Sequence, residues 1–228
     1  SCLSRAVAIG LFLSFRVAIT ATLLAFIIGI PIAYYLNRSN GRIADIIDTF
    51  LTLPIVLPPT VLGYYLLVLL GRQSSIGRML EEKFDITIVF TPTGAVIAAL
   101  VVSIPFLIKS ARSAFAGIDP ALLNAARVLG RTEFNIFLTI ILPLAWRGIA
   151  AGITLSFARA LGDFGATLMV AGSIPNETMT MPIAIYDALL AGNRDLVNIL
   201  VLIMTVVSIA VLYIINRLEK KLNKGQPQ

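Results

Sequence analysis

Long apolar stretches dominate this sequence of 228 residues. Four of them contain no charged residue: Val17 to Leu36, Thr49 to Gly71, Ile86 to Ile108 and Leu196 to Asn216. A helix needs about 20 apolar residues to cross the hydrocarbon core of a bilayer, and the buried helices of water-soluble proteins are rarely so long and so uniformly apolar. Each stretch is therefore predicted to be a transmembrane helix.

The region after residue 133 is also apolar, but three charged residues interrupt it: Arg147, Arg159 and Asp163. The piece from Phe134 to Trp146 is too short to cross a bilayer alone. We therefore predict an interfacial segment there and a further crossing, the fourth along the chain, from about Arg147 to Gly172. The expected fold is all-α, a single polytopic membrane domain over residues 1–228 with about five transmembrane helices.

Composition supports this assignment and removes several function classes. Hydrophobic residues make up 58% of the chain and charged residues 13%, with a mean hydropathy of +0.92, whereas soluble proteins carry roughly 25% charged residues. The sequence has one cysteine, Cys2, and no histidine. It therefore lacks an intrachain disulfide and the commonest catalytic base and metal ligand, so we predict no catalytic residue and no metal site.

Basic residues are distributed unevenly between the two ends of the predicted helices. If the C-terminus is cytoplasmic, eleven lie in inner segments: Arg38, Arg42, Lys109, Arg112, Arg127, Arg131, Arg147, Arg217, Lys220, Lys221 and Lys224. Five then lie in outer segments: Arg5, Arg72, Arg78, Lys83 and Arg194. Because Lys and Arg are enriched in cytoplasmic loops, we predict an outer N-terminus and a cytoplasmic C-terminus. The basic inner face would also suit anionic membrane lipid.

A short segment between the third and fourth crossings carries signals for both ends of a helix. Asp119 is a good N-cap, Pro120 is a good first helical residue, and Gly130 can take the left-handed conformation that ends a helix. A cytoplasmic helix of about residues 119–130 is therefore predicted. Ala125 and Ala126 are small enough to let another protein approach closely. The alternative is an ordinary amphipathic connector.

This segment resembles a motif of the permease subunits of binding-protein-dependent ABC importers. The motif reads E-A-A, three residues, G, nine residues and I-x-L-P; here it is Asn124-Ala125-Ala126, Gly130 and Ile140-Ile141-Leu142-Pro143. Asn124 replaces the motif's Glu, which affects the contacts of that side chain and not the shape of the helix. The resemblance implies that the helix docks in a cleft of a cytoplasmic ATPase. The expected coupling residues are Asp119, Pro120, Asn124, Ala125, Ala126 and Gly130.

Two further segments are similar to the molybdate permeases of that family. They are Leu53 to Tyr64, which reads LPIVLPPTVLGY, and Phe157 to Thr167, which reads FARALGDFGAT. The resemblance extends over about residues 11–213 and implies a MetI-like fold in a bacterial or archaeal inner membrane. It also implies four kinds of partner: a second copy of the chain, an ABC ATPase dimer that binds ATP and Mg²⁺, an extracytoplasmic molybdate-binding protein, and lipid. No cofactor is expected on this chain and no nucleic acid is an expected partner; tungstate is the alternative cargo.

Three prolines interrupt the second apolar stretch. Pro54, Pro58 and Pro59 remove backbone donors, which a membrane tolerates only where protein or a water-lined cavity satisfies the freed carbonyls. They are expected to form a wall of the pathway, with a packed kink as the alternative.

Arg159 and Asp163 are four residues apart on one face of the predicted fourth helix. Charges inside a membrane are rare and usually functional. Two explanations remain open: an ion pair that joins helices, or an arginine that faces an anion. Gly165, beside the pair, would allow close helix contacts.

Two other classes of membrane protein fit the sequence less well than an importer subunit. A self-contained carrier or anion channel would be expected to show paired repeats and several intramembrane acids, whereas only Asp163 qualifies. A membrane-embedded enzyme would need a cluster of nucleophile and base, and the sequence shows none. The sequence has no G-x-x-x-x-G-K-[ST] loop, so ATP hydrolysis is expected in a separate subunit.

Overall fold

The computed structural model describes residues 2–39, 41–85 and 87–224. Its elements in chain order are α1 (Cys2–Arg38), α2 (Arg42–Val56), α3 (Pro59–Leu70), α4 (Ser75–Phe84), α5 (Pro92–Ala116), α6 (Pro120–Val128), α7 (Glu133–Ile136), the π-helical segment η1 (Phe137–Ile141), α8 (Leu142–Leu161), α9 (Gly165–Ala171), α10 (Met181–Leu190) and α11 (Arg194–Lys224). No strand occurs in these residues, so the all-α prediction is confirmed.

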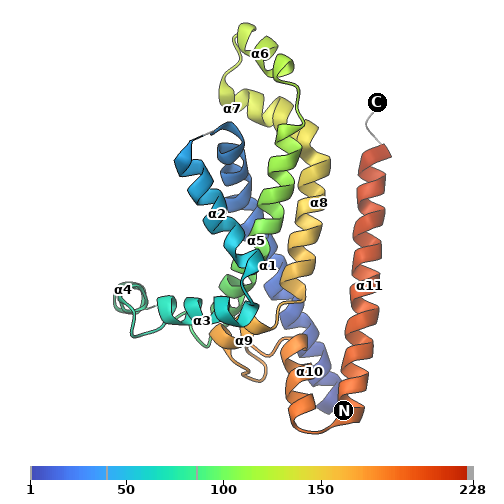
Figure 1. Cartoon of the computed structure of the whole chain (residues 1–228). Helices are drawn as coiled ribbons and strands as arrows, with labels where there is room; N and C mark the ends of the chain where they lie inside the picture. The colour runs from blue at the N-terminus through green and yellow to red at the C-terminus, as the bar shows by residue number, and fades with distance from the viewer. Residues whose placement is uncertain (1, 40, 86, 225–228) are drawn as a thin grey trace.

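Long helices run side by side along the molecule, with short helices at both ends (Figure 1). α6 lies beyond one end of the bundle, called here the α6 end, and α10 lies near the other, the α10 end. Four helical runs in the described residues are long and apolar enough to cross a membrane: Val7–Arg38, Pro92–Ala116, Glu133–Leu161 and Arg194–Leu218. α2 and α3 together make a fifth if their bent pair counts as one span.

The centre of the bundle consists of α5 packed between α1 and α8. Small residues let these helices approach closely: a Cβ added at Gly148 would lie 2.4 Å from the Cβ of Ala114, and one at Gly152 would lie 2.9 Å from the Cβ of Ser110. The Ser110 hydroxyl donates a hydrogen bond of 2.7 Å to the carbonyl of Gly148. Close packing of small residues is how membrane helices associate without a hydrophobic driving force between them.

The second apolar stretch is not one straight helix. α2 ends at Val56, α3 begins at Pro59, and the two axes are bent by 120°. Leu57 has an extended backbone, with φ −69° and ψ 138°, because a residue before proline is disfavoured in the α conformation. The prolines thus break the helix at the predicted place, and the crossing starts at Arg42 rather than near Thr49.

The fourth crossing also differs from its predicted limits. The interval 147–172 was wrong: the helical run begins at Glu133 and ends at Leu161, and η1 joins α7 to α8 without a break. The interfacial position of the segment before Arg147 stays a prediction, and α7 lies across the end of the bundle rather than along it (Figure 1). Gly162 ends α8, and α9 is a separate short helix. A charged side chain such as that of Arg147 does not end a helix, because termination depends on the backbone, here at Gly162.

Some residues used in the sequence argument fall outside this description. Ile86, where the third stretch was predicted to begin, is outside the described residues, and α5 begins at Pro92. The side chains of Arg5, Lys220, Lys221 and Lys224 are also outside them. The inner and outer charge count therefore remains a sequence argument.

Candidate functional site

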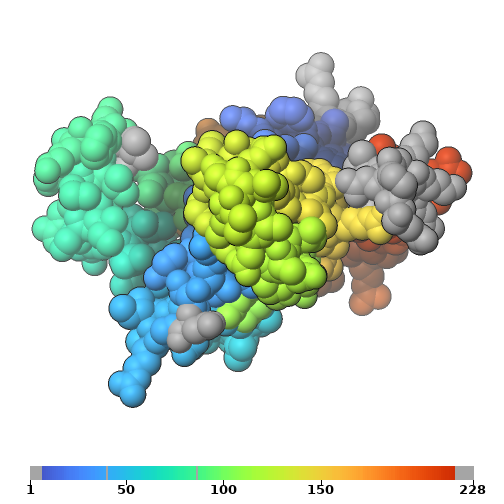
Figure 2. All heavy atoms as spheres, turned by 90° about the horizontal axis from the view of Figure 1, so that it is seen from above, coloured from blue at the N-terminus to red at the C-terminus, as the bar shows by residue number. Residues whose placement is uncertain are grey.

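The predicted short helix is present as α6, closed at both ends by its own residues. The Asp119 side chain accepts a hydrogen bond of 2.8 Å from the amide of Ala121, and Pro120 is the first helical residue. At the other end Gly130 has φ +77°, and the Arg131 amide donates to the carbonyl of Ala126 over 3.1 Å. This is the Schellman arrangement that glycine favours. Seen from the α6 end, the α6 and α7 segment stands out at the centre of the molecule (Figure 2).

The two alanines of α6 differ in a way that corrects the sequence argument. Ala125 is exposed, whereas Ala126 is only 6% exposed and packs with the hydrophobic core that includes Ile118 and Ile136. Ala126 therefore holds α6 to its own chain and is not open to a partner.

The outward side of α6 is more apolar than a free surface helix requires. Val128 is 87% exposed and Leu129 82%, and Leu122 is half-exposed. We define the α6 face as Leu122, Ala125, Val128 and Leu129. Positions 122, 125 and 129 share a helix face at i, i+3 and i+7, and Val128 adjoins them. Large apolar side chains this exposed outside the spans are typical of an interaction surface.

A charge network fixes the end of α6 to the bundle. Glu133, the first residue of α7, lies 2.7 Å from the guanidinium of Arg38 and 2.6 Å from that of Arg127. Arg127 also donates to the side chain of Asn124 over 2.8 Å. The hydrogen bond from Arg127 to Glu133 raises the pKa of the arginine above its ordinary value. Asn124, at the position of the motif's Glu, thus makes its contact within its own chain.

The α2–α3 break lies against α9 at the α10 end. Pro54 is inside α2, Pro58 precedes α3, and Pro59 begins it. A Cβ added at Gly165 would lie 3.1 Å from Cγ2 of Thr60 and 3.2 Å from Cβ of Pro59. Gly165 therefore allows close packing of the break on α9, as expected for a small residue there.

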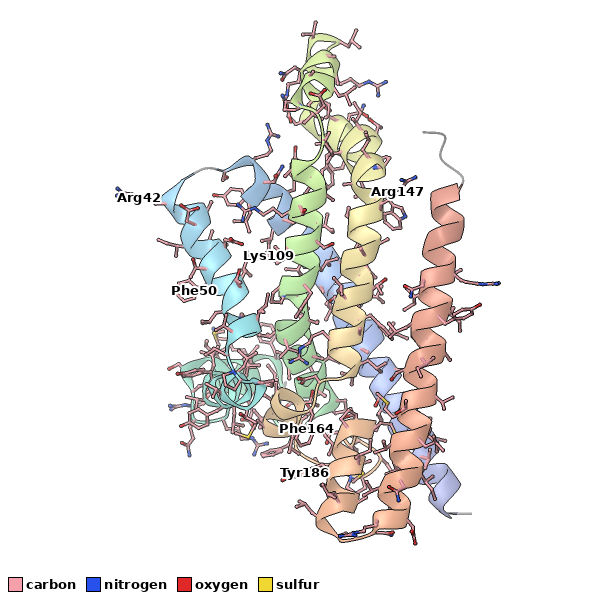
Figure 3. All side chains as sticks on the ribbon, turned by 45° about the vertical axis from the view of Figure 1, so that its right-hand side comes forward. Arg42, Phe50, Lys109, Arg147, Phe164 and Tyr186 are labelled. Carbon is pink, nitrogen blue, oxygen red and sulfur yellow. The ribbon has the colours of Figure 1, made fainter. Side chains whose placement is uncertain are left out.

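Arg159 and Asp163 do pair, but not on one helix. Arg159 Nη1 lies 3.4 Å from Asp163 Oδ1, and the carboxylate is buried. Asp163 lies beyond the end of α8, and its other oxygen accepts bonds from the Thr167 amide at 3.0 Å and hydroxyl at 2.7 Å. Asp163 therefore caps the first turn of α9 while it neutralises an arginine of α8. Phe164, the next residue, contacts Tyr186 of α10, with ring centroids 5.0 Å apart (Figure 3).

The candidate residues consequently form two groups. The coupling residues gather at the α6 end, whereas Pro58, Pro59, Gly165, Arg159 and Asp163 gather at the α10 end near α9. A third cluster, between α2 and α5, was not anticipated from the sequence: Asp48 lies 3.1 Å from Lys109 Nζ and 3.0 Å from Arg112 Nη1.

Comparison with known proteins identifies the family of this chain. The family model described as the inner membrane component of binding-protein-dependent transport systems matches residues 25–225. The chain belongs to this family. The resemblance seen in the motifs is therefore confirmed, and the chain is a component of a transport system of the inner membrane.

Similar members of this inner membrane component family include two ModB proteins, each described as a molybdenum transport system permease protein. ModB of Escherichia coli strain K12 is 44% identical over 177 residues, which cover 78% of this chain and 77% of that protein. ModB of Haemophilus influenzae is 37% identical over 218 residues, or 93% and 95% of the two chains.

A solved structure of the MetNI methionine ABC transporter in inward-facing form also matches. Its TM-score is 0.74, at 16% sequence identity, over 97% of this chain and 98% of that chain. This likeness concerns the fold, and it confirms the expected MetI-like architecture.

Sequence reasoning missed the exposed pair Val128 and Leu129 and the Asp48 cluster. The exposed pair could have been found, since two large apolar residues end a helix that lies outside every predicted span. The Asp48 cluster could not, because Asp48 and Lys109 are far apart in the sequence and only the fold brings them together.

Proposed function

We propose that this chain is the membrane-spanning permease subunit of an ATP-driven importer for molybdate, with tungstate as the alternative cargo. The observation that carries this proposal is the 44% and 37% identity to ModB proteins described as molybdenum transport permeases. The LPIVLPPTVLGY segment is the one that favours molybdate among related permeases, and its Pro59 and Thr60 pack closely on Gly165 of the FARALGDFGAT segment.

In this proposal two copies of the chain enclose the translocation path. The α6 end is cytoplasmic and the α10 end faces outward, so the chain starts outside and ends in the cytoplasm. The charge count supports this orientation, because the basic residues of the α6 end include Arg38, Arg127 and Arg131, in accord with the positive-inside rule.

A separate ATPase dimer, which binds ATP and Mg²⁺, contacts the α6 face, and a molybdate-binding protein delivers the anion to the α10 end. Two observations support α6 as the contact. Its outward residues are apolar and exposed, and its inner side is anchored through Ala126 and the Glu133 network. A force applied to α6 would therefore reach α1 and α8 rather than bend a loose loop.

The deciding experiment is co-expression of the chain with ATPase and binding-protein subunits from one molybdate system, followed by uptake of labelled molybdate into vesicles. We expect the ATPase to co-purify with the chain, and uptake to require both ATP and the binding protein. Uptake without ATP would indicate a carrier or channel instead, and uptake of another anion alone would exclude molybdate as the cargo.

A further inference from the structure

The cluster between α2 and α5 has an unusual charge balance. One carboxylate, that of Asp48, faces two cations, and a single oxygen, Oδ2, lies 3.1 Å from Lys109 Nζ and 3.0 Å from Arg112 Nη1. Figure 3 shows Lys109 between the two helices. Taken by themselves, these three side chains carry a net charge of +1.

These charges lie in a candidate membrane span. α5 covers Pro92–Ala116, so the span continues as one helix beyond the uncharged stretch that ends at Ile108. Lys109 and Arg112, which the sequence count placed in an inner segment, are therefore part of the last turns of this helix. At a rise of about 1.5 Å per residue, Lys109 is about 10.5 Å and Arg112 about 6 Å from its end at Ala116.

The cluster is also open on one side. The side chains of Asp48, Arg112 and Lys109 are 24%, 33% and 43% exposed. Charged side chains within a membrane span face a protein interior or a water-filled cavity rather than lipid tails. Because these three side chains are partly exposed and not enclosed by their own chain, we take the side of α2 and α5 that carries them to border an aqueous space. α2 is also the helix that ends at the proline break.

We propose that Lys109 and Arg112 form an oxyanion-binding site in the cytoplasmic half of the translocation path, where a tetrahedral dianion replaces Asp48 as their partner. This inference rests on the proposed function. In the structure described here Asp48 occupies the two donors and ties α2 to α5. An arriving dianion carries twice the negative charge of the Asp48 carboxylate and has several acceptor oxygens. The ammonium group of Lys109 and the guanidinium group of Arg112 bind such oxygens strongly. Asp48 then acts as the competitor that lets the anion leave again.

The test measures molybdate binding to the purified complex of permease and ATPase, without binding protein, in discs of phosphatidylcholine. Equilibrium dialysis gives the dissociation constant. Lys109→Gln and Arg112→Gln should each weaken binding about tenfold, the loss expected for one charge-assisted contact, and Asp48→Asn should strengthen it about tenfold. Arg42→Gln is the matched control, since it removes a positive charge from the exposed start of α2 and should leave binding unchanged.

Several outcomes separate this site from its alternatives. If all three variants of the cluster lower the unfolding temperature while molybdate binds as to wild type, the cluster only holds α2 on α5 and the proposal fails. If Asp48→Asn weakens binding, the competitor role is wrong. Parallel samples with sulfate, phosphate or phosphatidylglycerol identify the source of the ligand: displacement by free oxyanions supports the site, whereas displacement by the lipid alone assigns it to a headgroup.

The proposed function is judged separately, by uptake into vesicles that contain the wild-type transporter. If the wild type imports no molybdate, the function is wrong, whatever binds at Lys109. If the wild type imports molybdate and the Lys109→Gln and Arg112→Gln variants bind and import it equally well, only the inference fails.

Discussion

The buried carboxylate of Asp163 connects α8 to α9. It pairs with Arg159 at the end of α8 and accepts two hydrogen bonds from Thr167 in α9. The two partners are not equivalent, because Asp163 keeps the bonds from Thr167 when the arginine is removed. Arg159, by contrast, has no other polar partner among the described residues and stays partly buried when the aspartate is removed.

We therefore expect Asp163→Leu to be far more harmful than Arg159→Leu. Removing either member of a buried pair typically costs about 3–5 kcal/mol. Asp163→Leu also leaves the amide and the hydroxyl of Thr167 without their acceptor, which adds about 1–3 kcal/mol for each group. Thermal unfolding in detergent measures the order. Asp163→Asn, which still accepts from Thr167, should fall between them, and combining Asp163→Leu with Arg159→Leu should not restore wild-type stability.

Gly63 is a second position at which one atom decides the packing. A Cβ added there would lie 2.7 Å from the Cβ of Met169 and 2.9 Å from the Cα of Ala166. Gly63→Ala should therefore push α3 away from α9 and lower stability by about 1–3 kcal/mol, the usual cost of overpacking. Gly41→Ala is the control, since a Cβ there meets nothing within 4 Å. Equal unfolding temperatures for the two variants would contradict the close contact.

These residues also mark the limits of sequence reasoning. The caps of α6, Asp119 and Gly130, could be predicted because they act within a few residues of themselves. The partner of Asp163 in α9 could not, since the predicted helix ran to Gly172, eleven residues beyond the end of α8 at Leu161. The burial of Ala126 was missed because a short amphipathic helix does not reveal which side meets its own protein.

At the scale of elements, α6 yields the most direct test of coupling. A charge at the exposed Val128 should disrupt docking of the ATPase while the bundle stays folded, because interfaces pack about as densely as interiors. We expect Val128→Asp to reduce co-purification of the ATPase at least tenfold, with insertion unchanged. The readouts are the amount of bound ATPase and the ATP hydrolysis stimulated by binding protein.

Two further variants help to interpret that measurement. Val128→Thr keeps the shape without the charge and should retain most of the association. Ala126→Asp would bury a charge in the core and should fail by misfolding, so it cannot report on docking. Unchanged association of Val128→Asp would make α6 an ordinary connector.

The number of membrane crossings was predicted more accurately than the residues at which each crossing begins and ends. Apolar length identified α1, α5 and α11, because a membrane demands about 20 such residues wherever a helix spans it. The run from Glu133 to Leu161 was misplaced because Arg147 was taken as a boundary. The bend after Val56 was foreseen from its prolines, but its angle of 120° depends on how α3 packs on α9.

The whole molecule carries a prediction about sidedness. A reporter fused after Leu222 should be cytoplasmic, and one inserted near Ser74, before α4, should be external. α1 begins at the α10 end and α11 ends at the α6 end (Figure 1), which requires an odd number of crossings. Labelling of single cysteines at the two sites in intact cells measures both. Reversed accessibility at both sites would overturn the proposed orientation.

The brevity of α2 has an electrical consequence. Its 15 residues span about 22 Å, less than the roughly 30 Å of hydrocarbon. A dianion drawn into a cell with a negative interior works against about 4.6 kcal/mol for each 100 mV. If water reaches the bend at Leu57, most of that voltage falls between the bend and the cations beside Asp48. Voltage would then oppose the anion mainly in this short interval, which is where we expect the energy of ATP to be applied.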